Sequence, residues 1–409
     1  MTAFEELEDQ VKSIYLIEDK GLIKLLCATV IANRLPLDPV WLFLVAPSGG
    51  GKTELINTLS KVTGIYPLSS VTAHTFISGQ KKTGMETSLL FVIKEGIITF
   101  KDFTSILSLQ KDDRQQVMGQ LREIYDGSYS KTFGTGEKIN WRGKIGLIGG
   151  VTTAIYVMRE IYAVMGERFL MYAPIMPDSI LMAQRAMENT RSIQVARANL
   201  QELFADYLDR VIGAPTTLDN IPDLTNKLRD EILELAEFAT RSRSPIDRSF
   251  TGSREISFIH PPELPTRFSS QLKSLAMSLI LINETKELLP LDQNILYKVA
   301  FDSIGLLRRQ CLETMAQYKF IETSGLAIRL NYPTTTVRFA LEELTALKVT
   351  DRAKQGRDNI WTIKEKYRAI INKYENIQMK NEDLTENVAE ENVDIDTEVV
   401  MEETDNVES

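Results

Sequence analysis

The sequence is poor in the residues that build disulfides and histidine- or cysteine-rich metal sites. It contains two cysteines, Cys27 and Cys311, and two histidines, His74 and His260. The cysteines lie far apart in the chain, each in an apolar stretch with helical spacing. A disulfide framework, a cysteine-rich metal site and a Ser-His catalytic triad are therefore not expected, and a reducing compartment suits the chain.

Long hydrophobic runs are also missing. No apolar run reaches the roughly 18 residues that a membrane-spanning helix needs. The amino terminus carries Glu5, Glu6, Glu8 and Asp9, where a signal peptide would have basic and then apolar residues. We therefore expect a cytoplasmic protein without a membrane partner.

Basic residues are absent from the end of the chain. Residues 381–409 hold twelve Asp or Glu and no Lys or Arg, and removing these twelve charges from the net charge of −9 leaves +3 for residues 1–380. A mildly basic body permits DNA binding. The acidic tail is expected to be disordered, and it either solubilises the chain or docks on a protein partner or on the basic surface.

The most specific feature that the sequence does contain is a strand, loop and helix pattern over residues 41–61. Five apolar residues are followed by Ala46-Pro-Ser-Gly-Gly-Gly-Lys-Thr53 and a helical run. Glycines let successive N–H groups point at phosphate oxygens, and the lysine reaches the β- and γ-phosphates. The pattern is that of a phosphate-binding loop, GxxxxGK[ST], with Ala46 in place of the first glycine. We expect ATP and Mg²⁺ as ligands, with Thr53 on the metal and the nucleotide held by Pro47, Ser48, Gly49, Gly50, Gly51, Lys52, Thr53 and Glu54.

An acidic residue ends the apolar strand pattern of residues 96–103. A carboxylate at the end of a parallel strand beside the loop strand would hold Mg²⁺ through water, opposite Thr53. Asp102 is the candidate for this second metal-binding residue.

Phe103 follows Asp102, at the place where a glutamate that orients the attacking water is usual. Two interpretations remain open. Either Asp102 binds the metal and the catalytic base lies elsewhere, with Glu123 and Asp126 as substitutes, or Lys101 and Asp102 occupy the acid pair and Asp102 takes the second role.

A basic hairpin and a further strand come next. Two short strand patterns flank Gly134-Thr-Gly136 and carry Lys131 and Lys138. The strand that follows is expected beside the loop strand, and Thr152 after its end can orient the attacking water.

Residues 311–366 give a second specific pattern. Two short helices, a tight turn, a longer helix from Thr334 and a β-hairpin with glycine at its tip are typical of a winged helix. The candidate DNA-binding residues are Arg338 on the longer helix and Arg352, Lys354 and Arg357 on the hairpin.

In this order, from about Trp41 to Ile282, the elements resemble those of AAA+ ATPases. The resemblance implies that Thr152 is sensor 1, that Arg168 is an arginine finger on the γ-phosphate of a neighbouring subunit, and that Arg267 is a lid residue touching the nucleotide. The basic hairpin is a feature of the helicase-like branch. Minichromosome-maintenance helicases share it together with a C-terminal winged helix, and the chain also resembles putative ATPases of phages and plasmids.

The resemblance further implies a hexamer whose pore hairpin contacts single-stranded DNA through Lys138 or Lys131, while the winged helix binds duplex. The chain departs from those helicases at Phe103, and we expect no counterpart of their N-terminal DNA-binding domain in residues 1–40.

The expected fold class is α/β, with N-terminal helices in 1–40, an AAA+ core with a parallel sheet in 41–177, a helical lid in 178–310, a winged helix in 311–368, and a helix end with the acidic tail in 369–409. The expected function is an ATP-dependent DNA motor, such as a replicative helicase, initiator or loader of a mobile element. The alternatives are an ATP-regulated DNA-binding protein without unwinding activity, and a nucleotide-binding switch with little hydrolysis.

Overall fold

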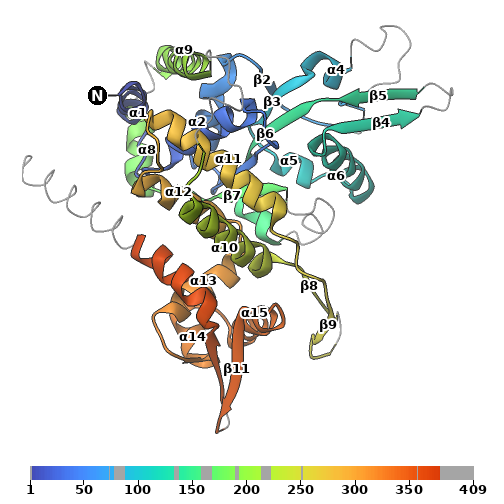
Figure 1. Ribbon diagram of the computed structural model, residues 1–409, viewed down its shortest axis with the longest axis vertical. Coiled ribbons are helices and arrows are strands. Elements are labelled where there is room, and N and C mark those ends of the chain that lie inside the picture. Colours follow the sequence, from blue (N-terminus) through green and yellow to red (C-terminus); the bar gives the residue numbers. More distant parts are fainter. Residues whose placement is uncertain are drawn as a thin grey trace, which may run out of the picture.

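A five-stranded parallel sheet forms the centre of the molecule (Figure 1). The computed structural model describes residues 2–72, 74–77, 88–132, 138–157, 168–188, 193–212, 223–249, 252–356 and 358–377. In spatial order, the strands of the sheet are β2 (Ile65–Leu68), β3 (Glu95–Phe100), β6 (Lys144–Val151), β1 (Trp41–Val45) and β7 (Phe169–Tyr172). The predicted α/β class with a parallel sheet is therefore confirmed.

The order of the strands differs from the prediction in one respect. Strand β6 lies between β1 and β3, so the strand that leads to Asp102 is not the neighbour of β1. The strand that leads to Thr152 is that neighbour, as predicted. After β1 the chain runs to the far edge of the sheet and returns, and β7 then pairs on the other side of β1. The carboxyl end of β1 is thus a topological switch point, where open α/β sheets bind ligands.

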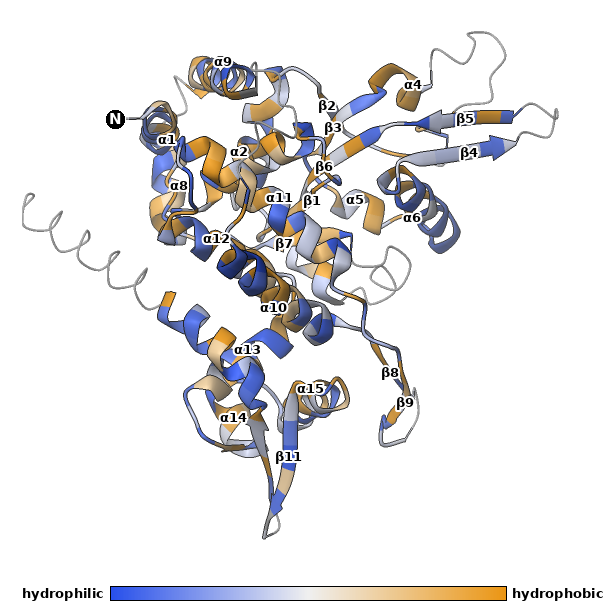
Figure 2. Ribbon diagram, in the orientation of Figure 1, coloured by the Kyte–Doolittle hydropathy of each residue, from blue (hydrophilic) through white to orange (hydrophobic). Residues whose placement is uncertain are grey.

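Both faces of the sheet are buried, which explains the continuous apolar run of β1. Leu42 and Leu44 pack into an apolar cluster with α2 (Leu22–Arg34) and α11 (Thr266–Asn283). Alternate residues point to the opposite face, where α6 (Lys111–Tyr125) covers the sheet. Figure 2 shows α2 as mostly hydrophobic and α6 as mostly hydrophilic on its outer side. A strand covered on both faces needs no polar alternation.

Other helices surround this sheet. Their bounds are α1 (Ala3–Ile14), α3 (Lys52–Thr58), α4 (Leu89–Ile93), α5 (Thr104–Leu107), α8 (Ser179–Glu188), α9 (Ile193–Ile212), α10 (Asn226–Arg243) and α12 (Pro290–Asp302), with the 3₁₀ helices η1 (Leu59–Lys61) and η3 (Thr153–Val157). Between η1 and α4 only β2 is extended, and the described residues after it form loop and turn.

Two antiparallel hairpins extend from this body (Figure 1). The first joins β4 (Ser128–Thr132) and β5 (Lys138–Arg142), and the second joins β8 (Ile246–Arg248) and β9 (Ile256–Ile259). The strands of the predicted basic hairpin are therefore present, while its tip at residues 133–137 lies outside the described residues.

The C-terminal part is a smaller unit of helices and an antiparallel sheet. It contains α13 (Leu306–Ala316), β10 (Ile321–Glu322), α14 (Thr323–Leu330), α15 (Thr334–Ala346), β11 (Thr350–Gln355) and β12 (Asp358–Ile363), and its sheet order is β10-β12-β11. Helix α13 begins five residues before the winged-helix pattern predicted over residues 311–366. Residues 365–377 are helical, so a helix follows β12 to the end of the described residues.

Ion pairs of Glu343 join the C-terminal unit to β8 of the body and link α15 to α13 within the unit. Glu343 of α15 is 3% exposed and accepts bonds from Arg248 of β8 and Arg308 of α13. Arg248 also donates to the Phe339 carbonyl at 2.8 Å. Because each guanidinium has a hydrogen-bonded carboxylate, these charges can be buried without a large penalty.

A carboxyl group on α13 makes the stability of this junction depend on pH. Burial raises the pKa of Glu313 to about 7, although Arg309 and Lys298 lower it, and Glu375 and Asp302 raise it further. The folded state therefore holds this proton between about pH 4.5 and 7, where the unfolded state has released it.

We expect the contribution of Glu313 to stability to be fully present below pH 4.5 and to be lost as the pH rises to 7. Glu313→Gln should therefore gain about 2 kcal/mol relative to the wild type between pH 5 and pH 8. Urea unfolding at the two pH values measures this change. A wild-type–variant difference that does not change with pH would show that the carboxyl titrates normally.

Candidate functional site

The loop after β1 is curled by glycines in the left-handed region. Gly49 and Gly51 have φ values of +83° and +74°, which disfavour any side chain. The Gly50 amide donates to the Pro47 carbonyl at 3.2 Å, and a Cβ on Gly50 would lie 3.1 Å from that oxygen. Gly51 is the residue before α3, so the loop leads directly into the first turn of this helix.

Lys52 lies across the inside of this loop. Its Nζ donates to the carbonyls of Ala46 at 2.6 Å and Pro47 at 2.7 Å. Burial lowers the pKa of Lys52, and the nearby Asp102 carboxylate raises it. The ammonium is therefore held at the loop by weak neutral acceptors, which a phosphate oxygen can replace.

The ends of β3 and β6 bring Asp102 and Thr152 to the same edge as Lys52. The Phe103 amide donates to the Gly150 carbonyl at 2.8 Å, and the Thr152 amide donates to Thr104 Oγ1 at 3.2 Å. Asp102 is exposed, and its Oδ1 accepts from the Thr104 amide at 2.9 Å. The candidate phosphate, metal and water-orienting residues thus converge at the carboxyl edge of the sheet.

Phe103 points away from this edge. Its ring is fully buried, 4.7 Å from the ring of Phe43 and 5.3 Å from that of Phe100. The position after Asp102 therefore belongs to the core, and an acidic residue there would not face the loop. Asp102 is the carboxylate that this strand end presents to solvent.

Oxygen ligands suited to Mg²⁺ are present at the loop. The Thr53 hydroxyl and the Asp102 carboxylate both lie on exposed residues. Within the described ranges, no group of three or more His, Cys, Asp or Glu side chains could hold a metal by itself. Mg²⁺ usually keeps several waters and takes one or two protein ligands plus phosphates, so these residues fit a nucleotide-borne Mg²⁺.

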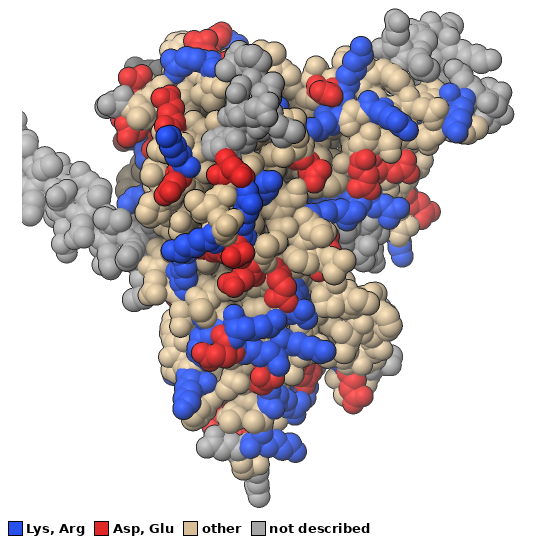
Figure 3. Space-filling view, in the orientation of Figure 1, with Lys and Arg blue, Asp and Glu red and all other residues tan. Residues whose placement is uncertain are grey.

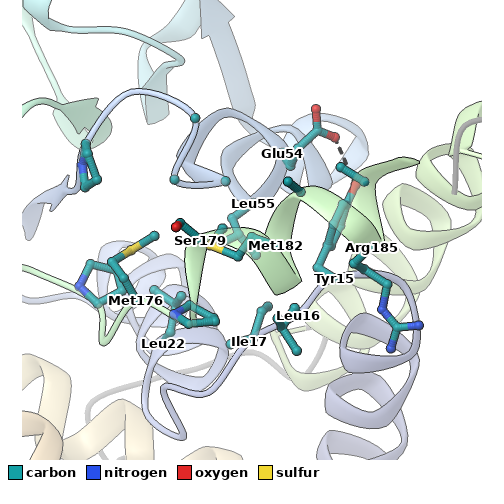
Figure 4. Close-up of a pocket in the computed structure, with 18 of the residues that line it drawn as sticks. Tyr15, Leu16, Ile17, Leu22, Glu54, Leu55, Met176, Ser179, Met182 and Arg185 are labelled. Carbon is teal, nitrogen blue, oxygen red and sulfur yellow. Dashed lines mark hydrogen bonds between the residues drawn. The ribbon is translucent and has the colours of Figure 1, made fainter. Parts of the chain in front are cut away.

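A cavity of about 650 Å³ adjoins the loop (Figure 4). It reaches the loop glycines, and its walls come from residues 14–17, residues 174–177 and helix α8. Leu16, Ile17, Met176 and Met182 supply much of its apolar lining. Its size and apolar character suit a nucleoside.

Polar residues fasten one rim of this cavity. Arg197 of α9 donates to both carboxylate oxygens of Glu54, at 2.7 and 2.6 Å. The Tyr15 hydroxyl donates to Glu54 Oε2 at 2.9 Å. Burial, and then the Glu54 carboxylate, raise the pKa of Tyr15 to about 12. The carboxylate of Glu54 in α3 therefore joins the C-terminal end of α1 to α9.

The opposite wall is held by Asp19, which is 2% exposed. Its carboxylate accepts from the Tyr172 hydroxyl at 2.5 Å and the Ile175 amide at 2.9 Å. Gly21 packs so closely that a Cβ would lie 2.8 Å from the Tyr172 hydroxyl oxygen. Asp19 therefore joins two distant segments that both line the cavity.

The arginine-finger role of Arg168 stays a prediction, and within one subunit its guanidinium is held by other residues. Arg168 precedes β7 at the amino edge of the sheet, is 4% exposed and pairs with Asp126 at 2.8 Å. Its guanidinium also lies 5.4 Å from the Tyr125 ring. A residue that acts on a neighbouring subunit needs an exposed guanidinium, whereas this one is bound within its own subunit.

The lid role of Arg267 likewise stays a prediction, and within one subunit this residue lies near two carboxylates away from the glycine loop. Arg267 lies in the first turn of α11, where its guanidinium is 3.9 Å from Asp126 and 3.8 Å from Glu263. Gln271, on the next turn, donates to the Arg168 carbonyl at 2.8 Å. This end of α11 thus packs at the amino edge, opposite the glycine loop.

The two substitutes proposed for the catalytic base lie at the amino edge as well. Asp126 is bound to Arg168, and the Gly143 amide before β6 donates to the carbonyl of Gly127, which follows Asp126, at 3.2 Å. Glu123 lies in the same last turn of α6, beside Tyr129 in β4, whose pKa is raised by burial and then by the Glu123 carboxylate. Neither carboxylate reaches the loop after β1.

The hairpin lysines lie on the projecting β4–β5 ribbon. Lys138 is exposed at the start of β5, and Lys131 of β4 is half-buried. Ile139 and Trp141 alternate with Lys138 along β5 and pack on the core, whereas Lys131 pairs with Ile139 across the ribbon and lies on the same face as Tyr129. Basic side chains are visible on this projection (Figure 3).

The basic residues of the C-terminal unit lie on α15 and β11. Arg338 is half-buried, 5.2 Å from the Phe339 ring and 3.9 Å from Glu342. Arg352 and Lys354 are exposed two residues apart, which places them on one face of β11. Arg357 lies outside the described residues.

Sequence reasoning missed the cavity residues that lie outside the loop and Glu54. Tyr15, Leu16 and Ile17 follow the first helix as an apolar run, which is the one local signal that could have marked them. Met182 and Arg197 carry no motif and are brought in by the packing of α8 and α9.

A scan against models of protein families and a search of curated proteins both gave no match to this chain. Among the described residues, no helix combines the length and apolar character needed to cross a bilayer.

Proposed function

We propose that this chain is a P-loop ATPase of the AAA+ type that uses ATP hydrolysis to act on DNA. One observation carries the nucleotide part: the glycine loop, Lys52, Asp102 and Thr152 converge at the switch point of the sheet, beside a cavity of about 650 Å³. A triphosphate on the loop then places its base in the adjoining apolar cavity.

Each residue has a defined part in this proposal. The loop amides and Lys52 bind phosphate oxygens, Thr53 and Asp102 hold Mg²⁺, and Thr152 orients the attacking water. The bound Mg²⁺ would neutralise charge that develops on the phosphates. Pro47, Ser48 and Glu54 support the loop and the rim of the cavity.

The DNA part rests on two basic surfaces. Lys131 and Lys138 would contact single-stranded DNA, and the winged-helix interpretation of residues 306–363 would place Arg338, Arg352 and Lys354 on duplex. In a ring of subunits, which we expect to be a hexamer, Arg267 is the arginine of the α11 end that is accessible to a neighbour, since its side chain is 44% exposed.

ATP turnover of the Lys52→Ala variant tests the nucleotide proposal. Lys111→Ala is the matched control, because Lys111 is an exposed lysine of α6. We expect Lys52→Ala to lower ATP turnover by about 10²–10³-fold, because one charged donor to the transferring phosphate is lost. Lys111→Ala should hydrolyse ATP like the wild type. Unchanged turnover in Lys52→Ala would refute the loop assignment.

The DNA proposal is tested by DNA-stimulated ATPase and strand separation on a forked duplex, with Lys138→Ala against Lys111→Ala. We expect DNA to stimulate the wild type and Lys138→Ala to lose most of that response. If the wild type hydrolyses ATP at a rate that does not depend on DNA, the motor function is excluded.

A second candidate is a nucleotide-binding switch with little hydrolysis, in which ATP regulates DNA binding by the C-terminal unit. The buried position of Phe103 favours it, because no acidic residue adjoins Asp102 to activate water. Tight ATP binding with turnover that stays slow when DNA is present would support this candidate over a motor.

A further inference from the structure

Glu54 is a carboxylate in an unfavourable place for a nucleotide site. It follows Thr53 directly, lines the cavity, and its side chain is 26% exposed. A nucleoside triphosphate is a polyanion, so a bare carboxylate beside it would oppose binding by Coulomb repulsion.

The structure gives this carboxylate a complete set of donors. Arg197 supplies Nε and Nη2 in a two-pronged contact, with distances of 2.7 and 2.6 Å, and Tyr15 supplies its hydroxyl at 2.9 Å. Both donors also line the cavity. Planar two-pronged pairing is the strongest way in which a protein neutralises a carboxylate.

Mechanical support for α9 does not depend on this contact alone. Lys61 pairs with Glu202, and Arg34 with Asp209, farther along the same helix. The apolar residues of α9 are also buried, among them Leu200, Phe204 and Leu208. Loss of the Arg197 contact should therefore expose the charge of Glu54 and leave the helix packed.

We propose that Arg197 is a positioning residue that masks the Glu54 charge and so allows the cavity to accept a triphosphate. The inference rests on the proposed nucleotide function. Beside the phosphate contacts of the loop amides and Lys52, part of the affinity for the phosphates then depends on an ion pair between α3 and α9. Tyr15 holds the shared carboxylate oxygen and orients it toward Arg197.

The test is calorimetric titration of the full-length chain with ATP, ADP and adenosine, without Mg²⁺ and at low salt. We expect Arg197→Ala to weaken ATP binding about tenfold, ADP less, and adenosine by less than about twofold. Arg197→Ala/Glu54→Gln should restore ATP affinity to within about threefold, because the repelling charge is gone. Arg197→Lys should retain most of the affinity.

Lys61→Ala is the matched control, since it also removes one positive charge that contacts α9 but does not line the cavity. Thermal unfolding verifies that each variant is folded. Equal weakening of ATP and adenosine by Arg197→Ala, or no rescue in the double variant, would overturn the masking role. If the wild type binds neither ATP nor ADP, the nucleotide function itself fails, which is a separate outcome.

Discussion

Replacing Asp102 with asparagine is expected to lower ATP turnover by about 10²–10³-fold while leaving Mg²⁺-free ATP binding within about twofold of the wild type. Asp102 is the carboxylate that the end of the β3 strand exposes, and its charge acts on Lys52 across the loop. Asparagine keeps the acceptor for the Thr104 amide but loses the charge that holds a cation.

Asp113→Asn is the control for this prediction, because Asp113 is an exposed carboxylate in the first turn of α6. Steady-state turnover over a range of Mg²⁺ concentrations separates loss of metal binding from loss of fold. Full ATP turnover in Asp102→Asn would show that the carboxylate at the end of β3 does not hold Mg²⁺.

Asp302→Ala is expected to destabilise the fold by about 3–5 kcal/mol, because it leaves two cations buried without their partner. The carboxylate is completely buried, forms an ion pair with Lys298 at 3.0 Å and pairs with Arg309. It also accepts from the Ala173 amide at 2.7 Å. The variant should bind ATP more weakly as well, because residues 174–177 after Ala173 line the cavity.

Urea unfolding measures the effect, with Asp230→Ala as the control, since Asp230 is exposed on α10 and should change stability by less than about 0.5 kcal/mol. A loss of less than about 1 kcal/mol in Asp302→Ala would mean that Lys298 and Arg309 find other partners or water.

The parts of the site with a strong local signal could be predicted from the sequence. Residues 41–53 combine a fully apolar strand with glycines at positions whose φ is positive, and this pattern needs no tertiary information. Asp102 and Thr152 were found because each follows an apolar strand, and parallel strands bring their carboxyl ends to one edge.

Other parts depend on packing between residues far apart in the chain. The sequence around Arg168 indicates an arginine finger. Its ion-pair partner Asp126 lies 42 residues earlier in the chain, and only the fold brings the two together. The sheet order placed β6 between β1 and β3, which no local pattern reveals. The cavity is assembled from the end of α1, the segment after β7, and helices α8 and α9, so its residues could not be recognised singly.

The central claim is that a nucleotide binds with its phosphates on residues 47–53 and its base in the cavity. Photolabelling with 8-azido-ATP, followed by peptide mapping, tests this claim most directly. We expect labelled peptides from residues 14–17 or 174–183, labelling that unmodified ATP competes away, and strong loss of label in Lys52→Ala. Labelling confined to other segments, or labelling that ATP does not reduce, would contradict the account.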